Sequence, residues 1–133
     1  METRSYTGPV IEESLADRSV LDGVRIISTT VEPVTENHQT PWIQQWTMHT
    51  VEIPKVDADD FAQRLSRALD RSHPWYADFK RESDHYIVFS DKVFHITDRA
   101  DKAQYDAATE HGRSLGIPDH QLDFSPYIKA WER

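Results

Sequence analysis

The segment 75–97, which reads "WYADFKRESDHYIVFSDKVFHIT", carries the side chains best suited to chemistry in this sequence. A histidine, whose reference pKa is about 6.5, can act as a general acid or base beside a phenol. In a catalytic interpretation, His95 is the general acid or base and Tyr86 is a hydrogen-bond donor. Asp78 is the acceptor that orients Tyr86. Tyr76 and Val88 extend the same surface and make it equally suited to binding a ligand or a partner.

Three short strands and two turns are predicted to position these residues. Centring the second turn on residues 91–92 pairs Phe89 with Phe94 and makes one face apolar, whereas a one-residue shift turns side chains to the wrong face. The same test on the first turn pairs Phe79 with His85. The predicted core face, lying under two helices, consists of Trp75, Ala77, Phe79, Ile87, Phe89, Phe94 and Ile96. The second face carries two rows, namely Tyr76, Val88 and His95, and Asp78, Tyr86 and Thr97.

On this second face, Tyr86 is predicted to touch Asp78 directly and His95 diagonally, at Cβ separations of about 5 Å and about 7 to 8 Å. Asp78 and His95 then lie on the order of 12 Å apart, from the strand spacing and the rise per residue. Tyr86 or a water molecule must therefore connect them. The cover of this face is left open between a terminal segment, a second subunit and a ligand.

The whole chain predicts an α+β domain in the order ββαβββα, with a largely antiparallel sheet of about five strands and two amphipathic helices packed on one face. Segments 24–34 and 42–54 are rich in β-branched and aromatic residues, as strands are. Segment 57–73 has apolar residues at helical spacing, and segment 97–118 ends with Gly116 before Pro118, a regular helix stop. Residues 1–133 are expected to form a single domain, with 1–22 and 118–133 as docking segments.

Composition argues against several classes of function. Fifteen Lys and Arg against 23 Asp and Glu give a net charge of −8, which repels nucleic-acid phosphates. No window is long and apolar enough for a membrane span, and "METRSYTGPV" lacks the basic and apolar regions of a signal peptide. The absence of Cys excludes disulfides and thiolate chemistry. We therefore expect a cytoplasmic location and neither nucleic-acid nor membrane partners.

The seven histidines do not form a metal pattern, since metal sites on one element need short spacings such as i, i+2 or i, i+4. His111 is interpreted as a packing residue of the second helix. The acidic residues of segment 57–60 fit helix capping better than cation binding. No metal or cofactor is expected, and no nucleophile elbow or phosphate-binding loop occurs in the sequence.

Three hypotheses for function follow. The first is a non-catalytic protein that binds an unknown protein or small molecule through Tyr76, Asp78, Tyr86, Val88 and His95. The second is a small metal-independent enzyme that uses His95, Tyr86 and Asp78. The third is a homodimer in which the second face of the 75–97 segment is the subunit seam.

Overall fold

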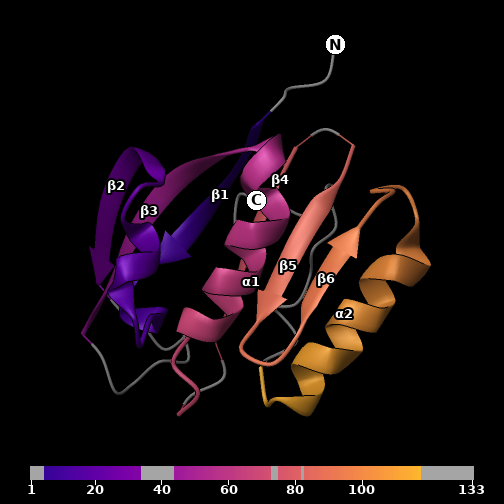
Figure 1. Cartoon of the computed structure of the whole chain (residues 1–133). Helices are drawn as coiled ribbons and strands as arrows, with labels where there is room; N and C mark the ends of the chain where they lie inside the picture. The colour runs from indigo at the N-terminus through magenta and orange to yellow at the C-terminus, as the bar shows by residue number, and fades with distance from the viewer. Residues whose placement is uncertain (1–4, 34–43, 73–74, 82, 118–133) are drawn as a thin grey trace.

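The structure is a computed structural model that describes residues 5–33, 44–72, 75–81 and 83–117. Its centre is a six-stranded antiparallel sheet that carries two α-helices (Figure 1). The predicted α+β class is confirmed, with one more strand than expected. The strands are β1 (Ser5–Ile11), β2 (Arg25–Pro33), β3 (Gln45–Pro54), β4 (Tyr76–Lys80), β5 (His85–Phe89) and β6 (Val93–Ile96). The helices are α1 (Ala58–Ala68) and α2 (Lys102–Ser114), with short 3-10 turns η1 (Glu12–Ser14), η2 (Arg18–Leu21) and η4 (Lys55–Asp57).

The additional strand, β1, lies in the middle of the sheet, whose order is β2-β3-β1-β4-β5-β6. Tyr6 and Val10 of this strand are buried in the main core. Gly8 allows the close approach to β4, because a Cβ at this position would lie 2.2 Å from the carbonyl oxygen of Asp78. Within the N-terminal segment, Ser5–Ile11 is thus a structural strand that joins the two halves of the sheet.

The register of β4 against β5 differs from the predicted one by a single residue. Phe79 pairs with Tyr86, and Asp78 pairs with Ile87. Phe79 and Tyr86 therefore share a face and stack at a centroid distance of 4.9 Å. The prediction was wrong because it gathered all apolar side chains on one face, whereas all five positions of β5 are buried and both faces accept apolar groups.

The register of β5 against β6 differs from the predicted one by two residues. Ile87 pairs with Phe94, and the Phe89 N–H donates to the Lys92 carbonyl at 2.7 Å to close a tighter turn. A shift of two residues keeps every side chain on its face. Ile87, Phe89, Phe94 and Ile96 consequently share one face, as predicted, although their partners differ.

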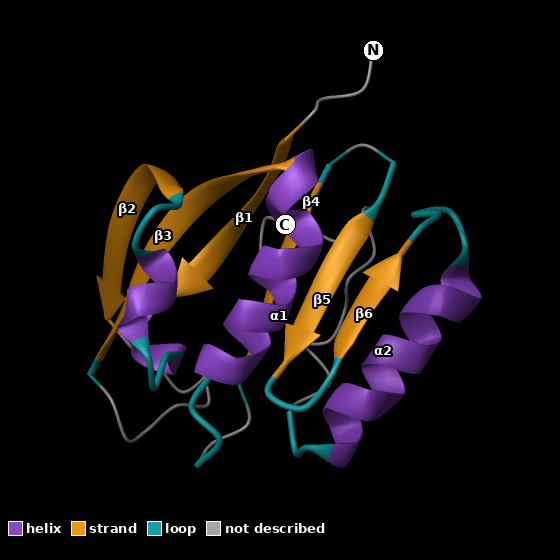
Figure 2. Ribbon diagram, in the orientation of Figure 1, coloured by secondary structure: helices purple, strands orange, loops and turns teal. Residues whose placement is uncertain are grey.

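The two helices pack on opposite faces of the meander formed by β4, β5 and β6, not on one face as predicted. Phe61 and Leu65 of α1 belong to the core cluster that contains Val88, whereas Tyr105 of α2 belongs to the cluster that contains Ile87. Consecutive strand residues point to opposite faces. Figure 2 shows α1 across the middle of the sheet and α2 beside β6. Helical periodicity identified both helices but carries no information on which face each one covers.

The helix ends agree in part with the sequence. Asp101 caps α2 by accepting from the Ala103 N–H at 3.0 Å, and Gly116 follows the helix with a positive φ of 88°. Asp57 stands at the N-cap of α1 but makes no side-chain cap bond to the described backbone. The predicted docking segment 118–133 lies outside the described residues.

Candidate functional site

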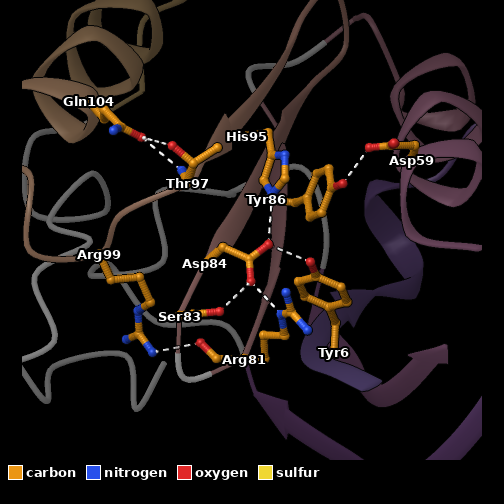
Figure 3. Close-up of polar contacts among 10 residues, drawn as sticks. All are labelled: Tyr6, Asp59, Arg81, Ser83, Asp84, Tyr86, His95, Thr97, Arg99 and Gln104. Carbon is orange, nitrogen blue, oxygen red and sulfur yellow. Dashed lines mark hydrogen bonds and ion pairs between the residues drawn. The ribbon is translucent and has the colours of Figure 1, made fainter. Parts of the chain in front are cut away.

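A buried carboxylate, Asp84, organises a polar cluster between β1, the β4–β5 turn and β6 (Figure 3). It accepts hydrogen bonds from the Tyr6 hydroxyl and the Arg81 guanidinium, from the Ser83 hydroxyl at 3.0 Å, and from His95 Nε2 at 2.7 Å. We call this group, together with Tyr86, the Asp84 cluster. Its members come from segments that are far apart in the sequence, so the sheet order assembles it.

The strand register places an aromatic pair beside this carboxylate. Tyr86 and His95 are directly opposed across β5 and β6, and their rings stack at a centroid distance of 4.1 Å with an interplanar angle of 6°. The Tyr86 hydroxyl donates to the carboxylate of Asp59 in α1. His95 is therefore held on one ring face by Tyr86 and at Nε2 by Asp84.

The electrostatics of the cluster favour an ionised Asp84. Burial by itself raises the pKa of this carboxyl, but its hydrogen-bond donors outweigh burial, and the pKa lies well below the ordinary value. Burial raises the pKa of the Tyr6 phenol, and the hydrogen bond to Asp84 raises it further. Burial, followed by the bond to Asp59, raises the pKa of Tyr86 in the same way. Both phenols thus remain neutral donors at physiological pH.

His95 is the accessible part of the cluster. Its side chain is 38% exposed, whereas the side chain of Asp84 is 6% exposed. Tyr86 covers one ring face, so the accessible surface of His95 belongs to the ring edge and the other face. Within the described part of the chain, Nδ1 of His95 has no hydrogen-bond partner. The imidazole can therefore present one nitrogen and one flat face to a ligand.

A second polar cluster lies on the opposite face of the meander, under α2. His85 is fully buried, and its Nε2 lies 2.7 Å from Asp78 Oδ2 while its Nδ1 lies 3.1 Å from the Tyr105 hydroxyl. A neutral imidazole that donates from Nε2 to Asp78 and accepts at Nδ1 from Tyr105 satisfies both contacts. Burial lowers the pKa of His85, although the bond to Asp78 partly opposes this. Because His85 is closed to solvent, this cluster has the character of a structural core network.

The structure thus divides the five predicted site residues between two faces. Tyr86 and His95 lie together, and Val88 shares their face but is fully buried beneath α1. Asp78 and Tyr76 lie on the other face, so the predicted contact between Asp78 and Tyr86 is wrong. The cause is the one-residue register difference of β4.

Four members of the Asp84 cluster, namely Tyr6, Arg81, Ser83 and Asp84, were not found from the sequence. Asp84 lies in a predicted turn, where an aspartate is common for local reasons. Tyr6 lies 78 residues from Asp84, in a segment with little strand pattern of its own. No local sequence signal connects Tyr6 with Asp84, because their contact depends on the central position of β1.

Among the described residues, no group of three or more histidine, aspartate or glutamate side chains could hold a metal ion. No helix in the described part of the chain is long and apolar enough to cross a membrane. Comparisons with protein-family models, curated proteins and solved structures find no significant match.

Proposed function

We propose that this protein is a binding protein and that His95 is the contact point of its recognition site. The observation that carries this proposal is the half-exposed imidazole, fixed by the stacked ring of Tyr86 and by the carboxylate of Asp84. A side chain held in this way loses little rotamer freedom when a ligand binds, which favours affinity.

The geometry also supports a class of ligand. The free ring face of His95 suits a flat group, such as an aromatic ring or an amide, because aromatic pairs favour stacked and edge contacts. The available Nδ1 suits a hydrogen-bonding atom beside that flat group. We therefore propose a small molecule or a side chain that combines a flat surface with an adjacent polar atom.

The test is a screen of small aromatic and amide compounds, monitored through the imidazole signals of the histidines by nuclear magnetic resonance. We expect saturable shifts of His95, and we expect binding to be lost in a folded His95→Ala variant. His111 is the matched control, because it also bonds a carboxylate, Asp91, at 2.8 Å but contacts phenylalanine rings rather than a stacked tyrosine. Equal shifts of His95 and His111, or no shift of either, would count against the proposal.

A catalytic role for His95 is the second candidate, and the Asp84–His95 pair favours it. A carboxylate that orients an imidazole through one nitrogen leaves the other nitrogen to act as a base. The test is hydrolysis of the activated ester p-nitrophenyl acetate. A catalytic His95 predicts a rate at least about tenfold above that of His95→Ala, with His111→Ala unchanged. Equal rates for all three proteins would remove this candidate.

A further inference from the structure

The edge strand β2 exposes an unusual amount of apolar surface. Ile26, Ile27 and Val31 are 42%, 50% and 56% exposed, and nearly the whole strand is accessible. Strand β2 pairs on one side only, with β3, so its outer edge presents backbone N–H and C=O groups without strand partners in the described sheet. An exposed edge with apolar side chains is a template for pairing with another strand.

A β-bulge gives this edge a specific pattern. The register against β3 shifts between Ile26 and Ser28, so that Ile27 is the extra residue. Because of this shift, Arg25 and Glu32 point to the same face of the sheet, although their positions differ by an odd number. Arg25 pairs with Glu52 of β3, and Glu32 pairs with Trp46, which lies on the same face of β3 as Glu52.

These positions make β2 complementary to itself. In an antiparallel pair of two β2 strands with Thr29 on the two-fold axis, Ser28 of one copy faces Thr30 of the other. The next position sets Ile26 and the extra residue Ile27 of one copy against Val31 of the other. The following position sets Arg25 against Glu32. Each contact occurs twice, as two-fold symmetry requires. Two-fold symmetry also requires that one residue faces its own copy across the axis. The alternative, in which residue i faces residue i+1, would pair side chains that point to opposite faces.

Neighbouring registers match less well. With Ser28 on the axis, Arg25 faces Thr30 and Ile26 faces Thr29. With Thr30 on the axis, Glu32 faces Ser28. The Thr29 register alone among these three joins opposite charges and apolar groups at once, and such cross-strand pairs stabilise sheets.

We propose that the outer edge of β2 binds a second copy of this chain, with Thr29 on the two-fold axis, to form a continuous twelve-stranded sheet from two six-stranded ones. The Arg25 guanidinium, which already bonds Glu52 at 3.2 Å, has further N–H groups for Glu32 of the other copy. Strand β6, which carries His95, is the opposite edge of the sheet, so the dimer leaves both His95 sites open.

The first test is charge reversal, followed by light scattering and sedimentation. We expect a dimer for the wild type, and about tenfold weaker association for Arg25→Glu and for Glu32→Arg, because each reversal replaces two attractions by two repulsions. The double reversal restores attraction across the seam, so it is expected to recover the dimer. Glu32→Arg leaves the internal Arg25–Glu52 pair intact, and Glu52→Gln controls for that pair.

The second test uses the absence of cysteine from the chain. Directly opposed strand residues have Cβ atoms about 4.5 to 5.5 Å apart, near the range that a disulfide bridges. Thr29→Cys is therefore expected to form a covalent dimer rapidly under mild oxidation. Val56→Cys, at a site that is 91% exposed, is expected to do so only slowly. A monomeric wild type at every soluble concentration, or equal cross-linking of the two variants, would overturn the proposal, as would a dimer that is insensitive to the reversals.

Discussion

At the scale of single residues, Asp84 is the point at which three separate segments meet. Its carboxylate joins Tyr6 of β1, Arg81 of the β4–β5 turn and His95 of β6. The group is buried, so each lost donor would leave either an unpaired charge or an unsatisfied polar atom. The positioning of His95 therefore depends on the same contacts that hold the sheet together.

Asp84→Asn is expected to lower the free energy of unfolding at pH 7 by about 3 kcal/mol or more, the range for removing one partner of a buried ion pair. The folded-state pKa of Asp84 is depressed, so its contribution is complete above the ordinary carboxyl value of about 3.9 and is lost as the pH falls below it. The difference between wild type and variant should thus shrink from about pH 5 towards about pH 2 in urea titrations. The control is Asp91→Asn, at a half-exposed site, where a loss as large as that of Asp84→Asn would contradict this account.

The buried contacts of His85 with Asp78 and Tyr105 lead to a different expectation. Tyr105→Phe removes the donor to Nδ1 of a buried imidazole and is expected to cost about 1 to 3 kcal/mol in the free energy of unfolding. The lowered pKa of His85 means that the folded state disfavours its protonation, so this group contributes stability above about pH 6.5 that is lost as the pH falls. Nitrogen spectra of the wild type should show that His85 carries less charge at about pH 6.5 than a free imidazole does, and that the proton of its neutral form lies on Nε2. A charged His85 in the folded protein at that pH would refute the assignment.

At the scale of elements, the contact between β1 and β4 is exceptionally close. The backbone of β4 lies so near to Gly8 that a Cβ there would meet the Asp78 carbonyl oxygen and Phe79. Both neighbours belong to the strand itself, so neither can move away as the end of a flexible side chain would. The junction of the two half-sheets therefore depends on the absence of a side chain at this position.

Gly8→Ala is expected to lower the free energy of unfolding by about 3 kcal/mol, at the upper end of the range for overpacking a core. Gly23→Ala is the matched control, because Gly23 has a positive φ of 81° but a Cβ placed there would have no described atom within 4 Å. Its cost is expected to be about 1 to 2 kcal/mol, from backbone strain alone. Equal losses in chemical denaturation would show that contact with β4 is not the cause.

The helices and the strands differ in how well sequence alone predicts them. Phe61 and Leu65 lie at helical spacing, and both are buried in α1 as that spacing predicts. Strand register depends instead on which face is covered, and the alternation of β5 disappears because both of its faces are buried. The candidate site was consequently predicted only in part. The pairing of Tyr86 with His95 depends on local strands, whereas Tyr6 and Asp84 meet only through the full sheet order.

At the scale of the whole molecule, the sheet has a protected centre and two unlike edges. Strand β1 has neighbours on both sides and contributes buried Tyr6 and Val10 to the core. Strand β2 has one neighbour in the described sheet and accessible side chains. Local opening in such a sheet should begin at the β2 edge and reach the centre last.

Amide hydrogen exchange in dilute protein should follow this order. We expect the slowest exchange in β1 and its partner strand β3, and fast exchange at the outward N–H groups of β2. Although β1 is the first described strand in the sequence, its place in the middle of the sheet is expected to decide its rate of exchange. Exchange of β1 amides as fast as those of β2 would contradict the central role of β1.

The central place of β1 also bears on synthesis. This strand is made before all the other described strands, yet its neighbours begin only at Gln45 and Tyr76. A nascent chain that has completed α1 can pair β1 with β3. The other edge of β1 stays unpaired until the β4–β6 meander has been synthesised. Unpaired edges of this kind associate with other chains, and distant pairings form slowly. Translation products that end before the meander are therefore the forms of this protein that most need a chaperone.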